Sequence, residues 1–99
     1  MTESTRVSPE VVDNPDESRF EIRVDGERAG QAAYRLSKDG AIMFLHTEIG
    51  DEHEGKGLGG ILVRAALDSA RERGLRVVPS CPFVRGWIER HPDYADLVR

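Results

Sequence analysis

The residues best suited to chemistry are gathered in the segment Glu54–Gly60, where four of the last six positions are glycine. Helix propensity cannot explain these glycines, because each one costs up to about 1 kcal/mol in a helix interior. Glycine instead lets the backbone approach a ligand closely and turn its N–H groups outward. A helix that begins here adds a partial positive charge, and Lys56 adds an ammonium group. The segment predicts a phosphate site; the alternative is a glycine turn that binds nothing.

Two common phosphate motifs match this stretch only in part. Gly50–Gly57 nearly spells a nucleotide P-loop, but Gly57 stands where a Ser or Thr would hold magnesium, and acids inside the loop would repel a triphosphate. Gly55–Gly60 matches GxGxxG literally, yet a dinucleotide fold needs an acid near the end of the next strand, and Val78–Ser80 offers none. Both motifs therefore fit less well than a third.

The third motif resembles the pyrophosphate signature of the GNAT superfamily of N-acetyltransferases, (Arg/Gln)-x-x-Gly-x-(Gly/Ala), with Gly57 and Gly59 at the glycine positions. The chain also resembles a short GNAT-like group of about its own length, from Phe20 to Val98. The segments that carry this narrower resemblance are His46–Ile49, Cys81–Val84 and Arg90–Tyr94.

One position departs from the superfamily signature. Glu54 stands where the superfamily has Arg or Gln, and a carboxylate cannot donate a hydrogen bond to phosphate. We therefore expect backbone amides and Lys56 to hold the pyrophosphate, and Glu54 to point away.

The resemblance implies acetyl-CoA as the acyl donor and suggests how it binds. The strand edge near Thr47–Ile49 would pair with the pantetheine amides, and the strand Arg76–Pro79 would diverge from it to open a slot for the thioester. Pro79 favours this divergence because it removes one hydrogen bond from the ladder. The predicted acetyl-CoA-binding residues are Thr47, Glu48, Ile49, Gly55, Lys56, Gly57, Leu58, Gly59 and Gly60.

Three residues are candidates for the transfer chemistry. Acetyl transfer needs a neutral amine, and Glu48, near the expected thioester, is either its general base or a solvent-facing carboxylate. His46, two residues earlier on the same side of the strand, either orients Glu48 and shuttles its proton or is structural. Cys81 precedes Pro82 at an expected helix start that would stabilise a thiolate. It is either a nucleophile that carries a covalent acetyl group or a small buried residue.

Other polar residues near the predicted site have weaker indications. His53 and His91 are predicted as surface or capping groups, and the histidines lack metal-ligand spacing with the cysteine, so we expect no metal. In the superfamily a tyrosine after this second helix often protonates the departing thiolate, so Tyr94 either does this or packs in the core. Arg85 and Arg90 either meet the adenosine phosphates or are solvated.

The elements ahead of the glycine segment are expected to be strands. Phe20–Val24 and Arg28–Leu36 alternate in the period of two that is typical of half-buried strands, with a turn at Asp25-Gly26. After a second turn at Lys38–Gly40, the longest apolar run, Ala41–Ile49, predicts a central strand. Tight turns between consecutive strands indicate an antiparallel meander.

The elements after the glycine segment alternate between helix and strand. Leu58–Arg73 has apolar residues at helical spacing and is followed by Gly74 as a C-terminal cap. Arg76–Val78 predicts a short strand, and Pro82–Arg90 predicts a second helix that Pro92 ends. The order β-β-β-α-β-α is an α+β class, and the resemblance identifies it as a reduced GNAT-like fold.

Length and composition limit the domain organisation. A chain of 99 residues suits one domain, which we place at 18–99. Residues 1–17 are polar and contain two prolines, so we expect a flexible or loosely packed lead-in, anchored only by Val11-Val12.

Charge and hydropathy exclude several classes of function. The net charge of -4 argues against a general nucleic-acid binder, and a single cysteine excludes an intramolecular disulfide. No apolar run suits a signal peptide or a membrane span, so we expect no membrane partner and a cytoplasmic location.

The leading prediction is an acetyl-CoA-dependent N-acyltransferase that acts on an amine of a small molecule or a protein. The alternative is a non-catalytic module that binds CoA or acetyl-CoA as a sensor or scaffold. Superfamily members of ordinary length build the acceptor site from extra N-terminal helices, which have no counterpart in this sequence. The acceptor site is therefore either open, which suits a protein substrate, or absent. A monomer or weak homodimer is expected, because a partner could cover a sheet edge in so small a domain.

Overall fold

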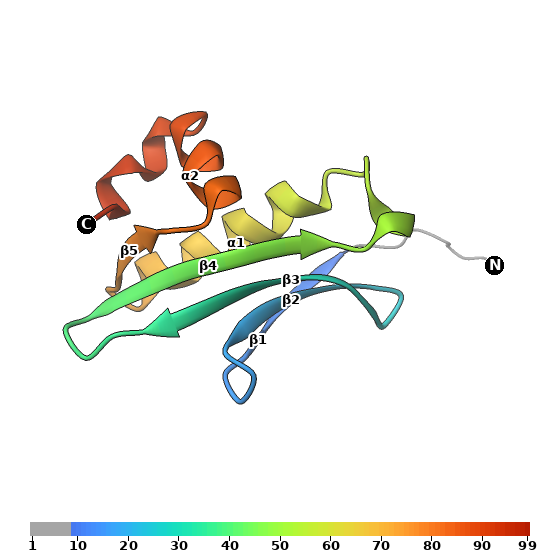
Figure 1. Ribbon diagram of the computed structural model, residues 1–99, viewed down its shortest axis with the longest axis horizontal. Helices are drawn as coiled ribbons and strands as arrows, with labels where there is room; N and C mark the ends of the chain where they lie inside the picture. The colour runs from blue at the N-terminus through green and yellow to red at the C-terminus, as the bar shows by residue number, and fades with distance from the viewer. Residues whose placement is uncertain (1–8) are drawn as a thin grey trace.

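Five strands form one sheet in the order in which they occur along the chain (Figure 1). The computed structural model describes residues 9–99. The strands are β1 (Glu10–Asn14), β2 (Arg19–Val24), β3 (Glu27–Leu36), β4 (Ala41–Ile49) and β5 (Arg76–Pro79). The α-helices are α1 (Leu58–Glu72) and α2 (Pro82–Glu89), and the short 3-10 helices are η1 (Asp51–His53) and η2 (Pro92–Leu97).

The predicted α+β class is confirmed, but the sheet contains one strand more than predicted. Strand β1 falls within the predicted lead-in and pairs antiparallel with β2, so residues 10–14 are part of the sheet and are not loosely packed. The sequence hides this strand because Val11 and Val12 are adjacent and do not alternate with polar residues. The rest of the predicted lead-in, residues 1–8, lies outside the described residues.

Helix α1 packs against one face of the sheet and provides much of the core. Leu62, Val63 and Leu67 are almost fully buried and join Ile22 and Phe44 in one hydrophobic cluster. Helix α2 packs against the same face, because its residues and those of β3, β4 and α1 border one small internal void. The fifteen-residue α1 keeps its apolar side towards the sheet, as its period predicts.

The opposite face of the sheet carries no helix among the described residues, and it buries a carboxylate (Figure 1). The alternating pattern of β2 predicts Glu21 on the solvent side, yet its side chain is only 2% exposed. Hydrogen bonds from Arg23 (2.7 Å), Asn14 (3.0 Å) and Arg19 (2.8 Å) surround it. These bonds, led by that of Arg23, lower the pKa of Glu21 to about 2. Alternation gives the face of a residue, but not whether its neighbours will cover it.

Strand β4 changes its neighbours along its length. It pairs antiparallel with β3 almost from end to end, with one irregularity in register beside Tyr34. On its other side it pairs in parallel with β5 only from Ala41 to Phe44. The pairing ends with Phe44 opposite Pro79, where β5 itself ends, so the rest of β4 has no strand partner on that side among the described residues. The predicted divergence of the two strands stays a prediction.

Candidate active site

Helix α1 begins directly after a loop with two glycines in the left-handed backbone region. Gly55 has φ +83° and Gly57 has φ +76°, and a residue with a Cβ adopts this conformation only with strain. The first backbone hydrogen bond of the helix runs from the Ile61 N–H to the Gly57 carbonyl (3.3 Å). The amides of residues 58–60 precede it and have no partner within the helix. No acid lies in the first turn of α1, so this group of amides favours an anion.

The other two glycines of the segment lie against α2, and Gly59 has a packing role that the sequence analysis did not foresee. A Cβ at Gly59 would lie 2.7 Å from the ring of Phe83, and one at Gly60 would lie 3.4 Å from the indole nitrogen of Trp87. Gly59 therefore lets α2 approach the start of α1 closely, whether or not a ligand is bound, whereas a side chain at Gly60 would only reach ordinary contact distance.

A cavity of about 370 Å³ lies where the free end of β4 meets the start of α1. The structure brings all the predicted acetyl-CoA-binding residues except Lys56 into its lining. The sheet contributes Thr47–Ile49, and the loop and helix start contribute Gly55 and Gly57–Gly60. The cavity thus joins an unpaired strand edge to a group of unpaired helix amides.

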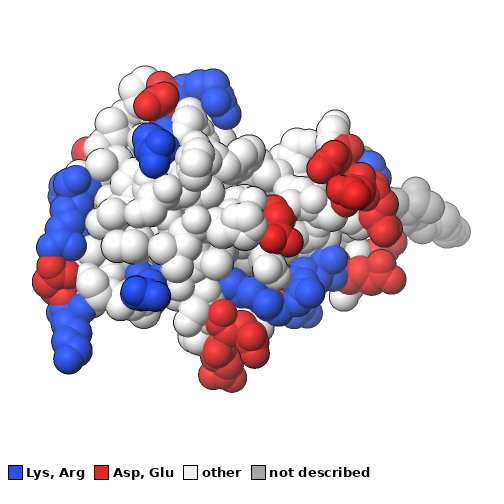
Figure 2. Space-filling view, in the orientation of Figure 1, with Lys and Arg blue, Asp and Glu red and all other residues white. Residues whose placement is uncertain are grey.

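Charged side chains around this cavity are mostly acidic. Asp51, Glu52 and Glu54 are exposed in the loop between β4 and α1, and acidic side chains gather over this corner of the molecule (Figure 2). Glu54, which we expected to point away, is among the lining residues, whereas Lys56 is not. Backbone amides, more than side-chain charge, are therefore what makes this cavity suitable for an anion.

Cys81 lies beside the point where the pairing of β4 with β5 ends. Its N–H donates to the Phe44 carbonyl (2.9 Å), and its thiol donates to the Thr47 hydroxyl (3.4 Å). The residue is 3% exposed and does not line the cavity, although Thr47 does. Cys81 is therefore close to the predicted thioester slot but covered by its neighbours.

His46 and Glu48 form a pair, as their spacing of two predicts. The His46 Nε2 lies 2.7 Å from a Glu48 carboxylate oxygen, and the two side chains are 63% and 59% exposed. Side chains alternate along a strand, so this pair faces away from the side of Thr47. The structure therefore joins His46 to Glu48 and places them on the opposite side of β4 from Cys81.

Three residues near the cavity were not predicted as site residues. His53 lines the cavity, and its Nδ1 is buried without a hydrogen-bond partner among the described residues. Phe83 lines it from α2. Gly30 lets β3 approach the end of β4, because a Cβ there would lie 2.6 Å from the Glu48 carbonyl. Only Gly30 had a sequence signal, since glycine inside a strand often marks a close backbone approach.

Metal ligands and membrane-spanning segments were searched for in the described part of the chain. Residues 9–99 contain no group of three His, Cys, Asp or Glu side chains that could hold a metal ion. Over the same residues, neither helix has the length and the apolar character needed to cross a bilayer.

Comparison with known families and curated proteins identifies relatives over most of the chain. A family model described as GCN5-related N-acetyl-transferase matches residues 19–97. The protein NATD1 of Bos taurus is 29% identical over 76 residues, which are 75% of this chain and 66% of the bovine protein. The chain thus spans slightly less than two thirds of that relative's length.

Comparison with solved structures finds the same architecture. A GCN5-like protein from Staphylococcus aureus, determined by NMR, has a TM-score of 0.70 and 28% identity, and the match covers 91% of this chain and 87% of that one. A ribosomal-protein-alanine N-acetyltransferase from Brucella melitensis has a TM-score of 0.57 and 24% identity, over 82% of this chain and 60% of its own. At that identity the second match supports the fold alone.

Proposed function

Because this chain belongs to the GCN5-related N-acetyltransferase family, we propose that it transfers an acetyl group from acetyl-CoA to an amine. Membership of this family supports acyltransferase activity in general. Acetyl-CoA as the donor and an amine as the acceptor are the parts that we propose. The observation that carries it is the cavity of about 370 Å³ between the free end of β4 and the start of α1.

The chemistry of CoA matches the two walls of this cavity. Beyond Phe44, the edge of β4 that faces away from β3 has no strand partner among the described residues. The pantetheine arm carries amide groups and can add to such an edge as an extended peptide does. Its diphosphate suits the amides of Leu58–Gly60, where the helix dipole favours negative charge.

In direct transfer, the neutral amine attacks the thioester carbonyl carbon, a C–N bond forms, the C–S bond breaks and CoA leaves as its thiolate. The amine loses one proton and the thiolate gains one, so the atoms balance. Glu48 is the proposed base that accepts the amine proton, and His46, 2.7 Å away, is the proposed relay that carries it to solvent.

A two-step route through Cys81 is the alternative chemistry. Its thiolate would displace CoA from the thioester, and the amine would then take the acetyl group from the cysteine. The thiol is 3% exposed and donates to Thr47, so this route needs local movement that direct transfer does not. We therefore favour direct transfer.

The proposed acceptor is an amine of a small molecule or of a protein. The His46–Glu48 pair lies on the sheet face without a helix among the described residues, so even an amine on a large surface can reach it. The same openness fits the second candidate, a non-catalytic CoA sensor, because no element of residues 9–99 forms a wall that would hold an acceptor there. A cytoplasmic location and a monomer or weak homodimer stay predictions.

Thiol release measured beside calorimetric binding separates these functions. Acetyl-CoA is incubated with the protein and a panel of amines that includes free amino acids, polyamines and peptides with free N-termini. Amine-dependent thiol release supports the transferase. Tight CoA binding without release supports the sensor, and failure to bind CoA at millimolar concentration rejects both.

A further inference from the structure

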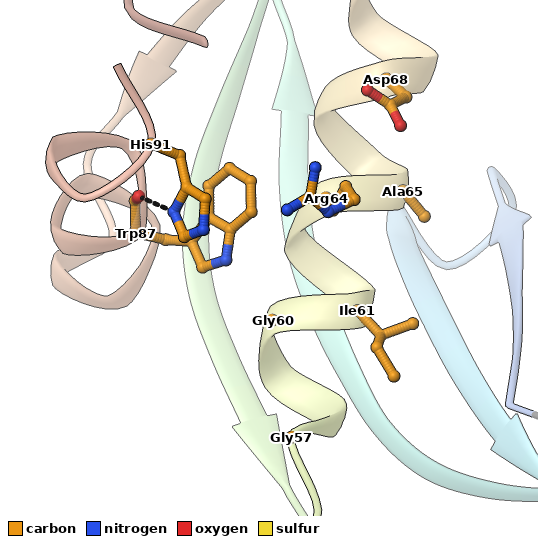
Figure 3. Close-up of a pocket in the computed structure, with 8 residues that line it drawn as sticks. All are labelled: Gly57, Gly60, Ile61, Arg64, Ala65, Asp68, Trp87 and His91. Atoms are coloured by element: carbon orange, nitrogen blue, oxygen red, sulfur yellow. Dashed lines mark hydrogen bonds between the residues drawn. The ribbon is translucent and has the colours of Figure 1, made fainter. Parts of the chain in front are cut away.

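A second groove begins at the same helix start and runs between α1 and α2 (Figure 3). It has a volume of about 460 Å³. Its lining includes Gly57, Gly60, Arg64, Asp68, Trp87 and His91. Gly57 and Gly60 also line the first cavity, so the two hollows meet where the proposed function places the diphosphate.

Two stacked rings form the α2 side of this groove. The rings of Trp87 and His91 are 3.8 Å apart and inclined by 10°. The Nδ1 of His91 lies 2.7 Å from the Trp87 carbonyl, which fixes the imidazole in this position. Trp87 is 4% exposed, so the half-buried imidazole of His91 offers more surface to the groove than the indole does. An aromatic ring beside an anion site is suited to a nucleobase or its sugar.

Arg64 faces these rings from α1 (Figure 3). Its guanidinium carbon lies 5.2 Å from the centre of the Trp87 ring, and its Nη1 donates to the Tyr94 hydroxyl (3.3 Å). That bond uses one of five N–H groups, so the exposed guanidinium keeps donors for a ligand. Arg64 is four residues after Gly60, so it lies on the same helix face about 6 Å further along the axis.

One acid, Asp68, also lines the groove. The Tyr94 hydroxyl donates to the Asp68 carboxylate (2.7 Å). This hydrogen bond, together with burial, raises the pKa of Tyr94, so the hydroxyl keeps its proton for Asp68 while accepting from Arg64. Tyr94 therefore positions Arg64. This role differs from protonation of the departing thiolate, which the sequence analysis considered for Tyr94.

We propose that this groove holds the adenosine end of CoA and that Arg64 binds its 3′-phosphate, so that the protein distinguishes CoA from dephospho-CoA. The inference rests on the proposed function, which places the diphosphate at Gly57–Gly60. In CoA one ribose carries both the diphosphate, on its 5′-oxygen, and the additional phosphate, on its 3′-oxygen. Arg64 offers a cation about 6 Å along α1 from Gly60, where the diphosphate is proposed to bind. Arg85 and Arg90, considered from the sequence, line neither cavity.

Calorimetry with CoA and with dephospho-CoA, which lacks only the 3′-phosphate, tests the inference on the full chain. The wild type should bind CoA about tenfold more tightly than dephospho-CoA, as one charge-assisted contact at an exposed site provides. Arg64→Gln should reduce that ratio to about twofold or less and leave dephospho-CoA affinity nearly unchanged. Arg85→Gln removes the same charge outside the groove and should keep the wild-type ratio.

Fluorescence gives a second readout, because Trp87 is the chain's one tryptophan. CoA should change its emission, whereas pantetheine, which lacks the nucleotide, should not.

The outcomes separate the inference from the function on which it rests. If the wild type binds none of these ligands, the proposed function fails and the inference fails with it. If CoA and dephospho-CoA bind equally, or if a folded Arg64→Gln variant keeps the wild-type ratio, the inference fails alone. A matching loss of preference in Arg85→Gln would also overturn it, because a general loss of charge would then explain the result.

Discussion

The two halves of strand β4 show how one element provides both stability and a site. From Ala41 to Phe44 the strand lies between β3 and β5, and Ile42 and Phe44 are 0% and 1% exposed. From Leu45 to Ile49 it has β3 on one side only, Leu45 is 39% exposed, and the strand borders the cavity. The loss of one neighbouring strand therefore turns a core element into an edge with backbone groups available to a ligand.

The largest effect on stability should come from the half of β4 that lies between β3 and β5, Ala41–Phe44. Phe44→Ala should lower the free energy of unfolding by about 4 kcal/mol, because it removes a buried ring and leaves a cavity in the core. Leu45→Ala, the adjacent residue on the free half, should cost less than about 1 kcal/mol. Urea unfolding measures both, and equal costs would mean that the two halves do not differ in stability.

The next effect should come from the loop that follows the free half. Gly57→Val should lower CoA affinity at least about 100-fold, close to 3 kcal/mol, because a branched residue at φ +76° moves the helix amides. Gly40→Val is the matched control, because Gly40 has a similar φ of +88° in the turn before β4. It should lose comparable stability and keep CoA affinity in calorimetry. Equal affinity losses in the two variants would contradict a ligand role for the Gly57 loop.

A third test compares two carboxylates in one row across the sheet, in which Glu21 lies opposite Gln31, and Gln31 opposite Glu48. Glu48→Gln should lower kcat about 100-fold and keep CoA affinity and stability, because it removes the proposed base. Steady-state kinetics with a reactive amine measures this effect. An unchanged kcat would exclude Glu48 as the base.

Glu21→Gln serves as the control. It should keep kcat but change how the free energy of unfolding depends on pH. The folded pKa of Glu21, about 2, lies below its usual value of 4.5. Its contribution is therefore present above about pH 4.5 and is lost as pH falls towards 2. Unfolding midpoints between these pH values should fall in the wild type more steeply than in the variant, and equal slopes would contradict the assignment.

The smallest effect should come from Cys81, beside the junction of the two halves. Cys81→Ala should cost about 1 kcal/mol of stability and leave acetyl transfer within about threefold of the wild type, since direct transfer does not use the thiol. Mass spectrometry of the wild type after incubation with acetyl-CoA should show no acetyl adduct. An adduct that disappears in Cys81→Ala, together with lost activity, would establish the two-step route instead.

Strand β4 and helix α1 could be predicted from the sequence because their signals are local. The apolar run Ala41–Ile49 matches β4 residue for residue, and glycine before Leu58 marks the start of α1. Strand β1 could not be predicted, because it depends on pairing with β2 and has no alternation of its own. The glycine pattern located the cavity, but not the packing of Phe83 onto Gly59.

The remaining features depend on contacts between residues far apart in the chain. The cover over Glu21 needs three neighbouring side chains to fold towards it. The groove beside Arg64 exists only because α2 brings Trp87 against α1. The spacing of residues in α1 predicts only that Arg64 faces solvent, since spacing within one helix carries no information about the second helix.

Amide chemical shifts of ¹⁵N-labelled protein titrated with CoA test the central claim most directly, because they report on backbone N–H groups one by one. The account predicts the largest changes at Thr47–Ile49 and Leu58–Gly60, with Ala41–Phe44 nearly unchanged. Saturable shifts confined to other parts of the chain, or no shifts at millimolar CoA, would contradict it.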